Sequence, residues 1–176
     1  EMFLRVGHAY GIPTVALRYF NIYGSRQALS NPYTGVLAIF SGRMLCKKAP
    51  VIYEDGNQTR DFVHVSDIVQ ANLLAMEKPQ ADFGVFNVGT GRATSVRQVA
   101  GLLMSELATE VLPQIAMQFR EGDIRHCYAD ITKIERALGY KPRVALEDGM
   151  SELVEWVRSQ TPEDRFEKAD RELGGR

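Results

Sequence analysis

The sequence predicts an α/β fold, in which helices alternate with the strands of a parallel sheet. Residues 15–17 and 85–88 are short, mostly apolar runs, as is typical of strands buried on both faces of such a sheet. The first run follows a helical segment that ends at Gly11 and Pro13, which makes one helix-to-strand unit. With 176 residues, of which 45% are hydrophobic, the chain can bury one sizeable core.

The N-terminal part is expected to contain two helices around a loop. Apolar residues recur at helical spacing over residues 1–10, which we predict to be the last turns of a helix whose beginning lies upstream. Residues 25–35 are rich in turn formers, and an amphipathic helix over residues 36–44 follows them. We expect this second helix to cover the loop.

The middle of the chain alternates short strands with turns. Residues 51–53 are a strand candidate, and residues 54–57 are a turn. Residues 61–65 alternate polar and apolar side chains, which predicts a half-buried strand. Ser66 or Asp67 is then expected to cap the helix that follows.

Three further helices are predicted toward the C-terminus. Ser95 and Gln98 form a capping-box pattern at the start of the first. Asp130 is placed to cap the second, over residues 131–138. The third is expected over residues 146–157, where apolar side chains again recur at helical spacing.

The charge balance argues against several classes of partner. With 21 basic and 22 acidic residues, the net charge is −1, so no polybasic face would attract nucleic acid or anionic lipid. No apolar run approaches the ~20 residues of a membrane helix. Cys46 and Cys127 lack the spacing of a metal or redox pair. We therefore expect a cytoplasmic protein with reduced cysteines.

The histidines do not indicate a metal site. His8, His64 and His126 are scattered, without His-x-x-x-His spacing or clustered carboxylates. His64 shares a face of its predicted strand with Phe62, so we expect a packed or hydrogen-bonded core histidine there. Residues 89–91 (Gly-Thr-Gly) lack the third glycine of a dinucleotide fingerprint.

Two polar residues stand next to strand candidates, where a ligand could be bound. Asn21 follows the first apolar strand directly, at the edge where open α/β sheets bind ligands, although an asparagine can also end a strand by bonding its own backbone. Arg60 lies between a turn and a strand, where its planar guanidinium can bind a phosphate through two parallel hydrogen bonds. A surface ion pair with Asp61 is the alternative for Arg60.

Three strings resemble the motifs of one enzyme family. They are LRYFNIYG at residues 17–24, QTRDFVHVSD at residues 58–67 and FREGDIRHCYAD at residues 119–130. Together they resemble the nucleotide-sugar epimerases and dehydratases of the extended short-chain dehydrogenase family, and the resemblance covers the chain up to about Gln160. It implies a Rossmann-like fold, tightly bound NAD and a UDP- or dTDP-linked sugar as substrate.

The resemblance also implies a set of site residues. Tyr19 and Phe20 would lie near the cofactor. The substrate-binding residues that it implies are Asn21, Val36, Val51, Tyr53, Arg60, Arg120 and Asp123. Of these, the asparagine and both arginines would contact the diphosphate, and the aspartate would take the ribose hydroxyls. The residues from the predicted strand over 51–53 would meet the pyrimidine ring.

Residues 26–36 narrow the resemblance to two kinds of family member. RQALSNPYTGV resembles members that act on 6-deoxysugar nucleotides, such as dTDP-rhamnose 4-epimerases, and also short bacterial UDP-glucose 4-epimerases. Both alternatives stay open. Asn31 and Tyr33 either line the sugar pocket or are a turn asparagine before proline and a surface tyrosine.

The chain is expected to be the C-terminal half of such an enzyme. Residues 1–24 and 61–91 would close the Rossmann-like domain. Residues 25–60 and 92–160 would build a small α/β substrate-binding lobe, and residues 161–176 would form a polar tail. The complete enzyme is expected to be a homodimer.

The implied reaction is 4-epimerisation, in which NAD oxidises C4 of the sugar and the hydride returns to the opposite face. The family's Tyr-x-x-x-Lys pair and glycine-rich cofactor loop do not occur in this sequence. No catalytic residue is therefore assigned in the chain; all are expected upstream of Glu1, and the 176 residues alone are expected to be inactive. The alternatives are a 4,6-dehydratase or decarboxylase of the same family and a non-catalytic nucleotide-sugar or dinucleotide-binding protein.

Overall fold

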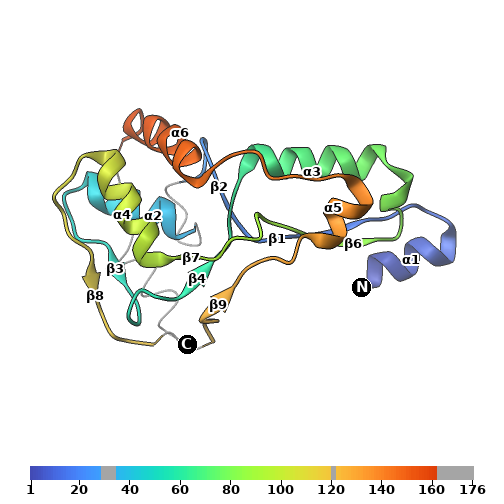
Figure 1. Ribbon diagram of the computed structural model, residues 1–176, viewed down its shortest axis with the longest axis horizontal. Coiled ribbons are helices and arrows are strands. Elements are labelled where there is room, and N and C mark those ends of the chain that lie inside the picture. The colour runs from blue at the N-terminus through green and yellow to red at the C-terminus, as the bar shows by residue number, and fades with distance from the viewer. Residues whose placement is uncertain (29–34, 120–121, 162–176) are drawn as a thin grey trace.

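The computed structural model describes residues 1–28, 35–119 and 122–161 (Figure 1). Its helices are α1 (Met2–Tyr10), α2 (Val36–Leu45), α3 (Val65–Glu77), the 3-10 turn η1 (Pro79–Ala81), α4 (Val96–Leu107), α5 (Thr132–Leu138) and α6 (Leu146–Arg158). Its strands are β1 (Ala16–Tyr19), β2 (Asn21–Tyr23), β3 (Val51–Ile52), β4 (Thr59–Arg60), β5 (Phe62–His64), β6 (Val85–Val88), β7 (Thr94–Ser95), β8 (Gln114–Ile115) and β9 (His126–Cys127). Asn31, Tyr33, Arg120 and the tail from residue 162 lie outside the described residues.

The strands pair mainly in parallel, which confirms the α/β prediction. β1 pairs with β6, with Ala16 opposite Val85, and β2 pairs with β5, with Asn21 opposite Phe62. β3 pairs in parallel with β8. β4 lies between β9, which is parallel to it, and β7, which is antiparallel. In Figure 1, α2, α4 and α6 gather at one end of the molecule, and α1, α3 and α5 lie at the other.

Two hydrophobic clusters hold these groups of elements together. The first joins α2, α4 and α6, and its large members are Tyr23, Leu37, Phe40, Met44, Ile52, Phe62, Val96, Val99, Leu103, Met150, Leu153, Val154 and Val157. The second lies between α3, β6 and α5, with Val63, Ile68, Phe86, Val88, Ile134, Leu138 and Tyr140. Phe62 and Val63 belong to different clusters because neighbouring side chains of a strand point to opposite faces. The proposed division of the chain into lobes stays a prediction.

The expectation of a half-buried strand over residues 61–65 was wrong. All three residues of β5 are buried, and so is Asp61 before it. The strand is short and lies between the two clusters, so neither of its faces meets water. Its alternating polarity instead reflects buried polar side chains, Asp61 and His64, that have specific partners.

The predicted cap of α3 was also wrong. The N-cap residue is His64, whose Nδ1 accepts from the backbone N–H of Ser66 at 3.4 Å. The Asp67 carboxylate is buried and accepts instead from the backbone N–H groups of Arg143 at 2.9 Å and Val144 at 3.3 Å. Asp67 therefore joins α3 to the segment that leads into α6.

Other local signals were confirmed. Gly11 ends α1 in the left-handed conformation, with φ 66°, and Ser95 and Gln98 form both bonds of a capping box at the start of α4. Asp130 is one residue further from α5 than expected, because the N-cap residue is Ile131. Its Oδ1 still accepts from the N–H of Thr132 at 2.9 Å. Hydrogen bonds from Thr132 lower the pKa of the Asp130 carboxyl.

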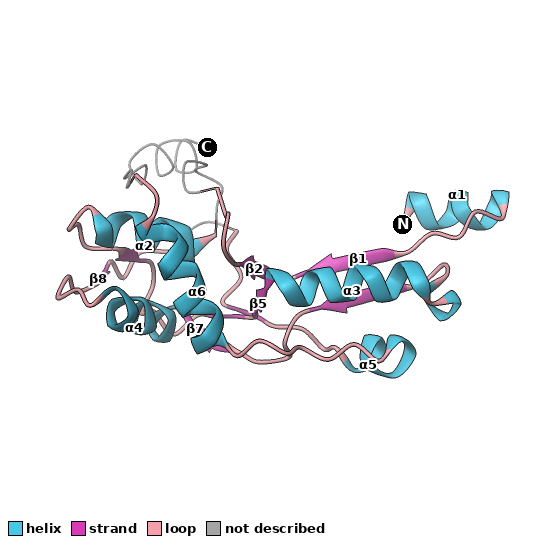
Figure 2. Cartoon of the chain, turned by 90° about the horizontal axis from the view of Figure 1, so that it is seen from above, coloured by secondary structure: helices cyan, strands magenta, loops and turns pink. Residues whose placement is uncertain are grey.

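Helices α1 and α3 expose large apolar side chains. Figure 2 shows α3 alongside β1, and α1 beyond its end. The exposed apolar residues of these two helices are Met2, Phe3, Val6, Tyr10, Val65, Val69, Leu73 and Met76. Within the described residues, β1 and β2 each pair along one edge only. No helix in these parts of the chain is long and apolar enough to cross a membrane.

Candidate functional site

The predicted site begins where the chain passes from β1 to β2. Phe20 donates its backbone N–H to Val88 of β6 at 3.2 Å, and Asn21 donates its N–H to Asp61, before β5, at 2.9 Å. The strand partner therefore changes between these two residues. The Asn21 side chain makes no hydrogen bond to any described residue. The alternative in which it bonds its own backbone is therefore not seen, and the amide is available to a ligand.

Tyr19 lies at the open edge of the same region. Its hydroxyl donates to Asn72 Oδ1 of α3 at 2.9 Å. With Val15, Leu17 and Met76, it lines a cavity of about 400 Å³ between β1 and α3. The predicted cofactor residue Tyr19 is thus hydrogen-bonded through its hydroxyl beside an open space with both polar and apolar lining residues.

Arg60 is held in a fixed orientation on β4, with its side chain 15% exposed. Its Nη2 donates to Asp123 Oδ1 at 2.6 Å, and its Nη1 donates to the carbonyl oxygens of Thr59 at 2.9 Å and Arg125 at 3.1 Å. The structure therefore brings two predicted site residues, Arg60 and Asp123, into contact. The alternative ion pair between Arg60 and Asp61 was wrong, because the Asp61 carboxylate is buried with other partners.

The remaining predicted binding residues are partly exposed at the rim of the first cluster. Val36 is the first residue of α2, and Val51 begins β3. Tyr53 follows β3, and its carbonyl oxygen accepts from Gln58 Nε2 at 2.9 Å. The shared role of these three residues with Arg60 stays a prediction. Arg120 lies outside those residues.

Asp61 is a structural centre that sequence reasoning missed. Its Oδ1 accepts from the N–H and hydroxyl of Thr90 at 2.8 and 2.6 Å, and its Oδ2 accepts from the N–H groups of Gly91 at 2.9 Å and Ala129 at 3.1 Å. A Cβ at Gly89 would come within 2.5 Å of Oδ2. The Gly-Thr-Gly loop is thus shaped around this carboxylate. The nearest signal in the sequence was a glycine-rich loop directly after a strand.

Arg125 was also missed. It connects the turn after β3 to Arg60, because its side chain bonds to Glu54 and Asp55 while its carbonyl oxygen accepts from Arg60. Glu54 has a positive φ of 50°, which the sequence gives no means to foresee. Only the arginine's position in the third motif string marked this residue at all.

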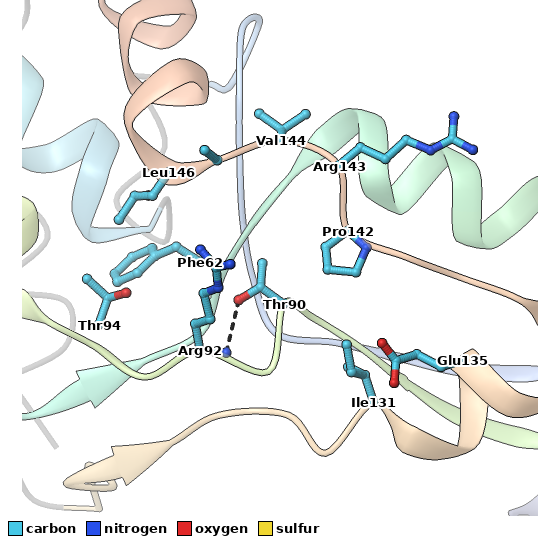
Figure 3. A pocket seen from close by; sticks show the side chains of 11 residues that line it. Phe62, Thr90, Arg92, Thr94, Ile131, Glu135, Pro142, Arg143, Val144 and Leu146 are labelled. Carbon is cyan, nitrogen blue, oxygen red and sulfur yellow. Dashed lines mark hydrogen bonds between the residues drawn. The ribbon is translucent and has the colours of Figure 1, made fainter.

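A separate cavity of about 260 Å³ contains none of the predicted site residues (Figure 3). Phe62, Thr90 and Arg92 line one side of it, and Glu135 and Pro142 line the other. The Thr90 hydroxyl accepts from the N–H of Arg92 at 3.1 Å. Within the described ranges, no group of three or more His, Cys, Asp or Glu side chains could hold a metal ion.

Parallel strands with polar residues at their carboxyl ends, and an arginine fixed nearby, are typical of α/β proteins that bind anionic ligands at the edge of a sheet. Residues 1–89 match the model of the NAD dependent epimerase/dehydratase family. The chain belongs to this family.

Two of the relatives carry the name of a 4-epimerase. The chain is 37% identical over 148 residues to dTDP-L-rhamnose 4-epimerase of Burkholderia thailandensis, which covers 84% of this chain and 40% of the relative. It is 39% identical over 150 residues to a putative UDP-glucose 4-epimerase of Methanocaldococcus jannaschii, which covers 85% of this chain and 47% of the relative. The chain thus spans less than half the length of these two relatives.

Solved structures of 4-epimerases are also similar to this chain. UDP-N-acetylglucosamine 4-epimerase of Methanobrevibacter ruminantium, in complex with UDP-N-acetylmuramic acid, matches with a TM-score of 0.85 and 36% identity, covering 92% of this chain and 51% of that one. UDP-glucose 4-epimerase of Thermotoga maritima, with UDP-glucose, matches with a TM-score of 0.82 and 43% identity. The match covers 90% of this chain and 50% of that one. The Thermus thermophilus UDP-glucose 4-epimerase, in complex with NAD, matches with a TM-score of 0.79 and 31% identity. The match covers 91% of this chain and 51% of that one. These likenesses confirm the Rossmann-type fold and membership of an NAD-dependent family.

Proposed function

We propose that this chain is the substrate-binding half of an NAD-dependent nucleotide-sugar 4-epimerase. The observation that carries the proposal is the Arg60 guanidinium, which is largely buried and fixed between Asp123 and two backbone carbonyl oxygens. A guanidinium that is already oriented loses little conformational entropy when it binds a phosphate. The chain has a net charge of −1, so a small dianion held by individual arginines suits it better than a polyanion.

The roles of the other residues follow from the family resemblance. Asn21 and Arg120 would join Arg60 on the diphosphate, and Asp123 would accept from the ribose hydroxyls. Val36, Val51 and Tyr53 would meet the nucleoside. Their combined effect would be to orient the sugar, and orientation of this kind can lower a reaction barrier by several kcal/mol.

The residues present also suit one edge of a nicotinamide site. Tyr19 and Phe20 stand at the end of β1, and Tyr19 lines an open cavity of about 400 Å³. When bound there, NAD would take a hydride from C4 of the sugar and return it. This chain's own contribution would be to pack against the cofactor and exclude water, while the catalytic tyrosine and lysine would come from elsewhere in the complete enzyme.

The exposed apolar side chains of α1 and α3 fit this division of roles between the two halves of the enzyme. Parallel sheets are almost always covered on both faces, yet the apolar side chains of α1 and α3 are exposed among the described residues, and β1 pairs along one edge only. We propose that the dinucleotide-binding half packs here and continues the sheet from β1. The length of the relatives, about twice that of this chain, supports this assignment.

A decarboxylase of the same family is the second candidate. The chain is 32% identical over 165 residues to UDP-N-acetyl-alpha-D-glucosaminuronate decarboxylase of Bacillus cytotoxicus. Such an enzyme would begin with the same C4 oxidation, so the binding residues would serve both reactions. Product analysis of the complete enzyme separates them, because only decarboxylation releases carbon dioxide.

The binding role is tested by titration calorimetry of the purified chain with UDP and with dTDP. Arg60→Ala removes a charge-assisted contact and should weaken binding by ~1.5–3 kcal/mol, or roughly 10- to 150-fold. Arg5→Ala is the control, because Arg5 forms an exposed pair with Glu1 on α1. Equal affinity in Arg60→Ala, or no binding of either diphosphate by the folded unmodified chain, would contradict the proposal.

A further inference from the structure

A single arginine connects the turn after β3 to the predicted phosphate-binding side chain. Arg125 Nη1 donates to Glu54 Oε2 at 2.5 Å, and its Nη2 donates to Asp55 Oδ2 at 2.9 Å. The carbonyl oxygen of the same residue accepts from the N–H of Thr59 at 2.9 Å and from Arg60 Nη1 at 3.1 Å. Arg125 therefore holds the turn through its side chain and Arg60 through its backbone.

The turn that Arg125 holds is strained. Glu54 adopts a φ of 50°, a left-handed conformation that is unfavourable for a residue with a Cβ. Its backbone is fixed by exchange of hydrogen bonds with Gln118 and Met117, at 3.0 and 3.1 Å. The Glu54 side chain is only 7% exposed, and a buried carboxylate is costly without a partner. Arg125 supplies that partner.

The charges around Arg125 argue against direct phosphate binding. Its guanidinium is bonded to two carboxylates, those of Glu54 and Asp55, which offset its single positive charge. The hydrogen bond from Arg125 lowers the pKa of the Asp55 carboxyl below its usual range. By contrast, Arg60 has one carboxylate partner, Asp123.

We propose that Arg125 is a positioning residue that fixes the Arg60 guanidinium, and that it acts on diphosphate binding only through Arg60. The role in diphosphate binding rests on the proposed function. The fixing of the Arg60 guanidinium by Arg125 does not depend on that function. Without the bonds from Arg125 to Glu54 and Asp55, the buried Glu54 carboxylate has no partner and turns toward water. The left-handed turn then changes its backbone conformation. The carbonyl oxygen of Arg125 then moves away from Arg60, and the guanidinium, left with its bonds to Asp123 and the Thr59 carbonyl oxygen, rotates more readily.

A double-mutant cycle with UDP as the probe tests the coupling. The four proteins are the unmodified chain, Arg60→Ala, Arg125→Ala and the double variant, titrated at one ionic strength. Arg125→Ala should weaken UDP binding about tenfold when Arg60 is present and less than twofold when it is absent. An equal loss in both backgrounds would overturn the proposal, because it would mean that Arg125 acts independently of Arg60.

A second measurement needs no ligand. Hindered rotation of a fixed guanidinium gives separate ¹H–¹⁵N signals for the two Nη groups, and these should be resolved for Arg60 in the unmodified chain. They should merge in Arg125→Ala and stay separate in Arg158→Ala, where the arginine removed bonds to the Glu106 carbonyl on α4 at 2.8 Å. Separate Arg60 signals in Arg125→Ala would overturn the proposal. If the unmodified chain failed to bind UDP, the proposed function would fail while this test still decided the positioning role.

A variant that removes the strain guards against misfolding. Glu54→Gly combined with Arg125→Ala removes the buried carboxylate together with its partner, and glycine takes the positive φ at no steric cost. This double variant should unfold at a higher urea concentration than Arg125→Ala alone. Its Arg60 signals should be separate again, because neither an unpaired buried carboxylate nor a strained turn is left to displace the backbone at residue 125. Merged signals in this folded protein would overturn the proposal that Arg125 acts on Arg60 through the turn.

Discussion

Asp61 shows how one buried side chain can organise distant parts of this chain. Its carboxylate accepts from Thr90, Gly91 and Ala129, which lie on the loop after β6 and on the segment after β9. All of these donors would lose their acceptor if the carboxylate were lost, and the N–H of the buried Ala129 would be left without a partner in the interior. The residue beside it, Arg60, bonds through its side chain to Asp123 instead. Adjacent residues therefore serve stability and binding separately.

Asp61→Asn tests this separation. The amide keeps the shape of the carboxylate but turns an N–H₂ group toward backbone N–H donors, so at least one buried donor loses its acceptor. The free energy of unfolding should fall by about 3 kcal/mol, as measured by urea denaturation. Asp82→Asn, at an exposed position before β6, should change it by less than about 0.5 kcal/mol. A loss below about 1 kcal/mol in Asp61→Asn would mean that the carboxylate is not the main support of the loop.

At this scale, the sequence revealed the site only where a motif carried it. Arg60 and Asp123 were predicted from the resemblance, and the structure places them in contact. Arg125 was not assigned a role, because its importance depends on the backbone conformation of Glu54 and on a contact between residues 71 positions apart. Neither property leaves a local pattern of residues.

At the scale of elements, local signals predicted the helices better than the strands. The glycine at the end of α1 and the capping box of α4 act within a few residues, so the sequence contains all the information. β5 was mispredicted because its burial depends on two clusters built from distant segments. His64 was expected to be a packed or hydrogen-bonded core histidine, and the structure confirms this, because the residue is buried and its Nδ1 is hydrogen-bonded to the Ser66 hydroxyl at 2.8 Å.

The packing of α6 can be tested by a glycine-to-alanine substitution that should destabilise this helix but stabilise α4. A Cβ at Gly149 would lie 2.4 Å from the Tyr23 hydroxyl and 3.0 Å from His64 Cδ2. Gly149→Ala should therefore lower the free energy of unfolding by roughly 1–3 kcal/mol, since the neighbours must move to relieve the overlap. Thermal and urea unfolding of the purified variant would measure this loss.

The matched control is Gly101→Ala on α4. A Cβ there would meet no atom within 4 Å, so only the helix propensity changes, and alanine should stabilise the chain by roughly 0.5–1 kcal/mol. The same substitution in two helices should thus have opposite effects. If both variants were stabilised, the contact of α6 with Tyr23 would be looser than the structure indicates.

At the scale of the whole molecule, buried tyrosines set the response to alkaline pH. Burial, with the nearby Asp67 carboxylate as a second cause, raises the pKa of Tyr23 and Tyr140 above the usual value of 10.0. Their stabilising contribution is complete below pH 10, where both folded and unfolded forms are neutral. It is lost as the pH rises above 10, because the unfolded chain then releases protons that the folded chain retains.

The free energy of unfolding should consequently fall above about pH 10, as measured by urea titrations followed by circular dichroism. Tyr23 and Tyr140 are two of the seven tyrosines in the chain, and their absorbance change at ionisation should coincide with unfolding. Tyr140→Phe should make the pH dependence shallower, at a cost of ~1 kcal/mol for the lost bond to the Gly89 carbonyl oxygen. Ionisation of all seven in a chain that retains native circular dichroism would contradict this account.

The two clusters meet at consecutive residues of one short strand, Phe62 and Val63. A pair of lobes joined by a flexible linker could tilt to open and close around a ligand, but lobes that share a strand cannot move apart without breaking it. The end of the molecule that carries Arg60 is therefore expected to keep a constant distance from the end that carries Tyr19. Any closure around a bound nucleotide would have to come from surface loops. A mutation in either cluster would affect the packing of both.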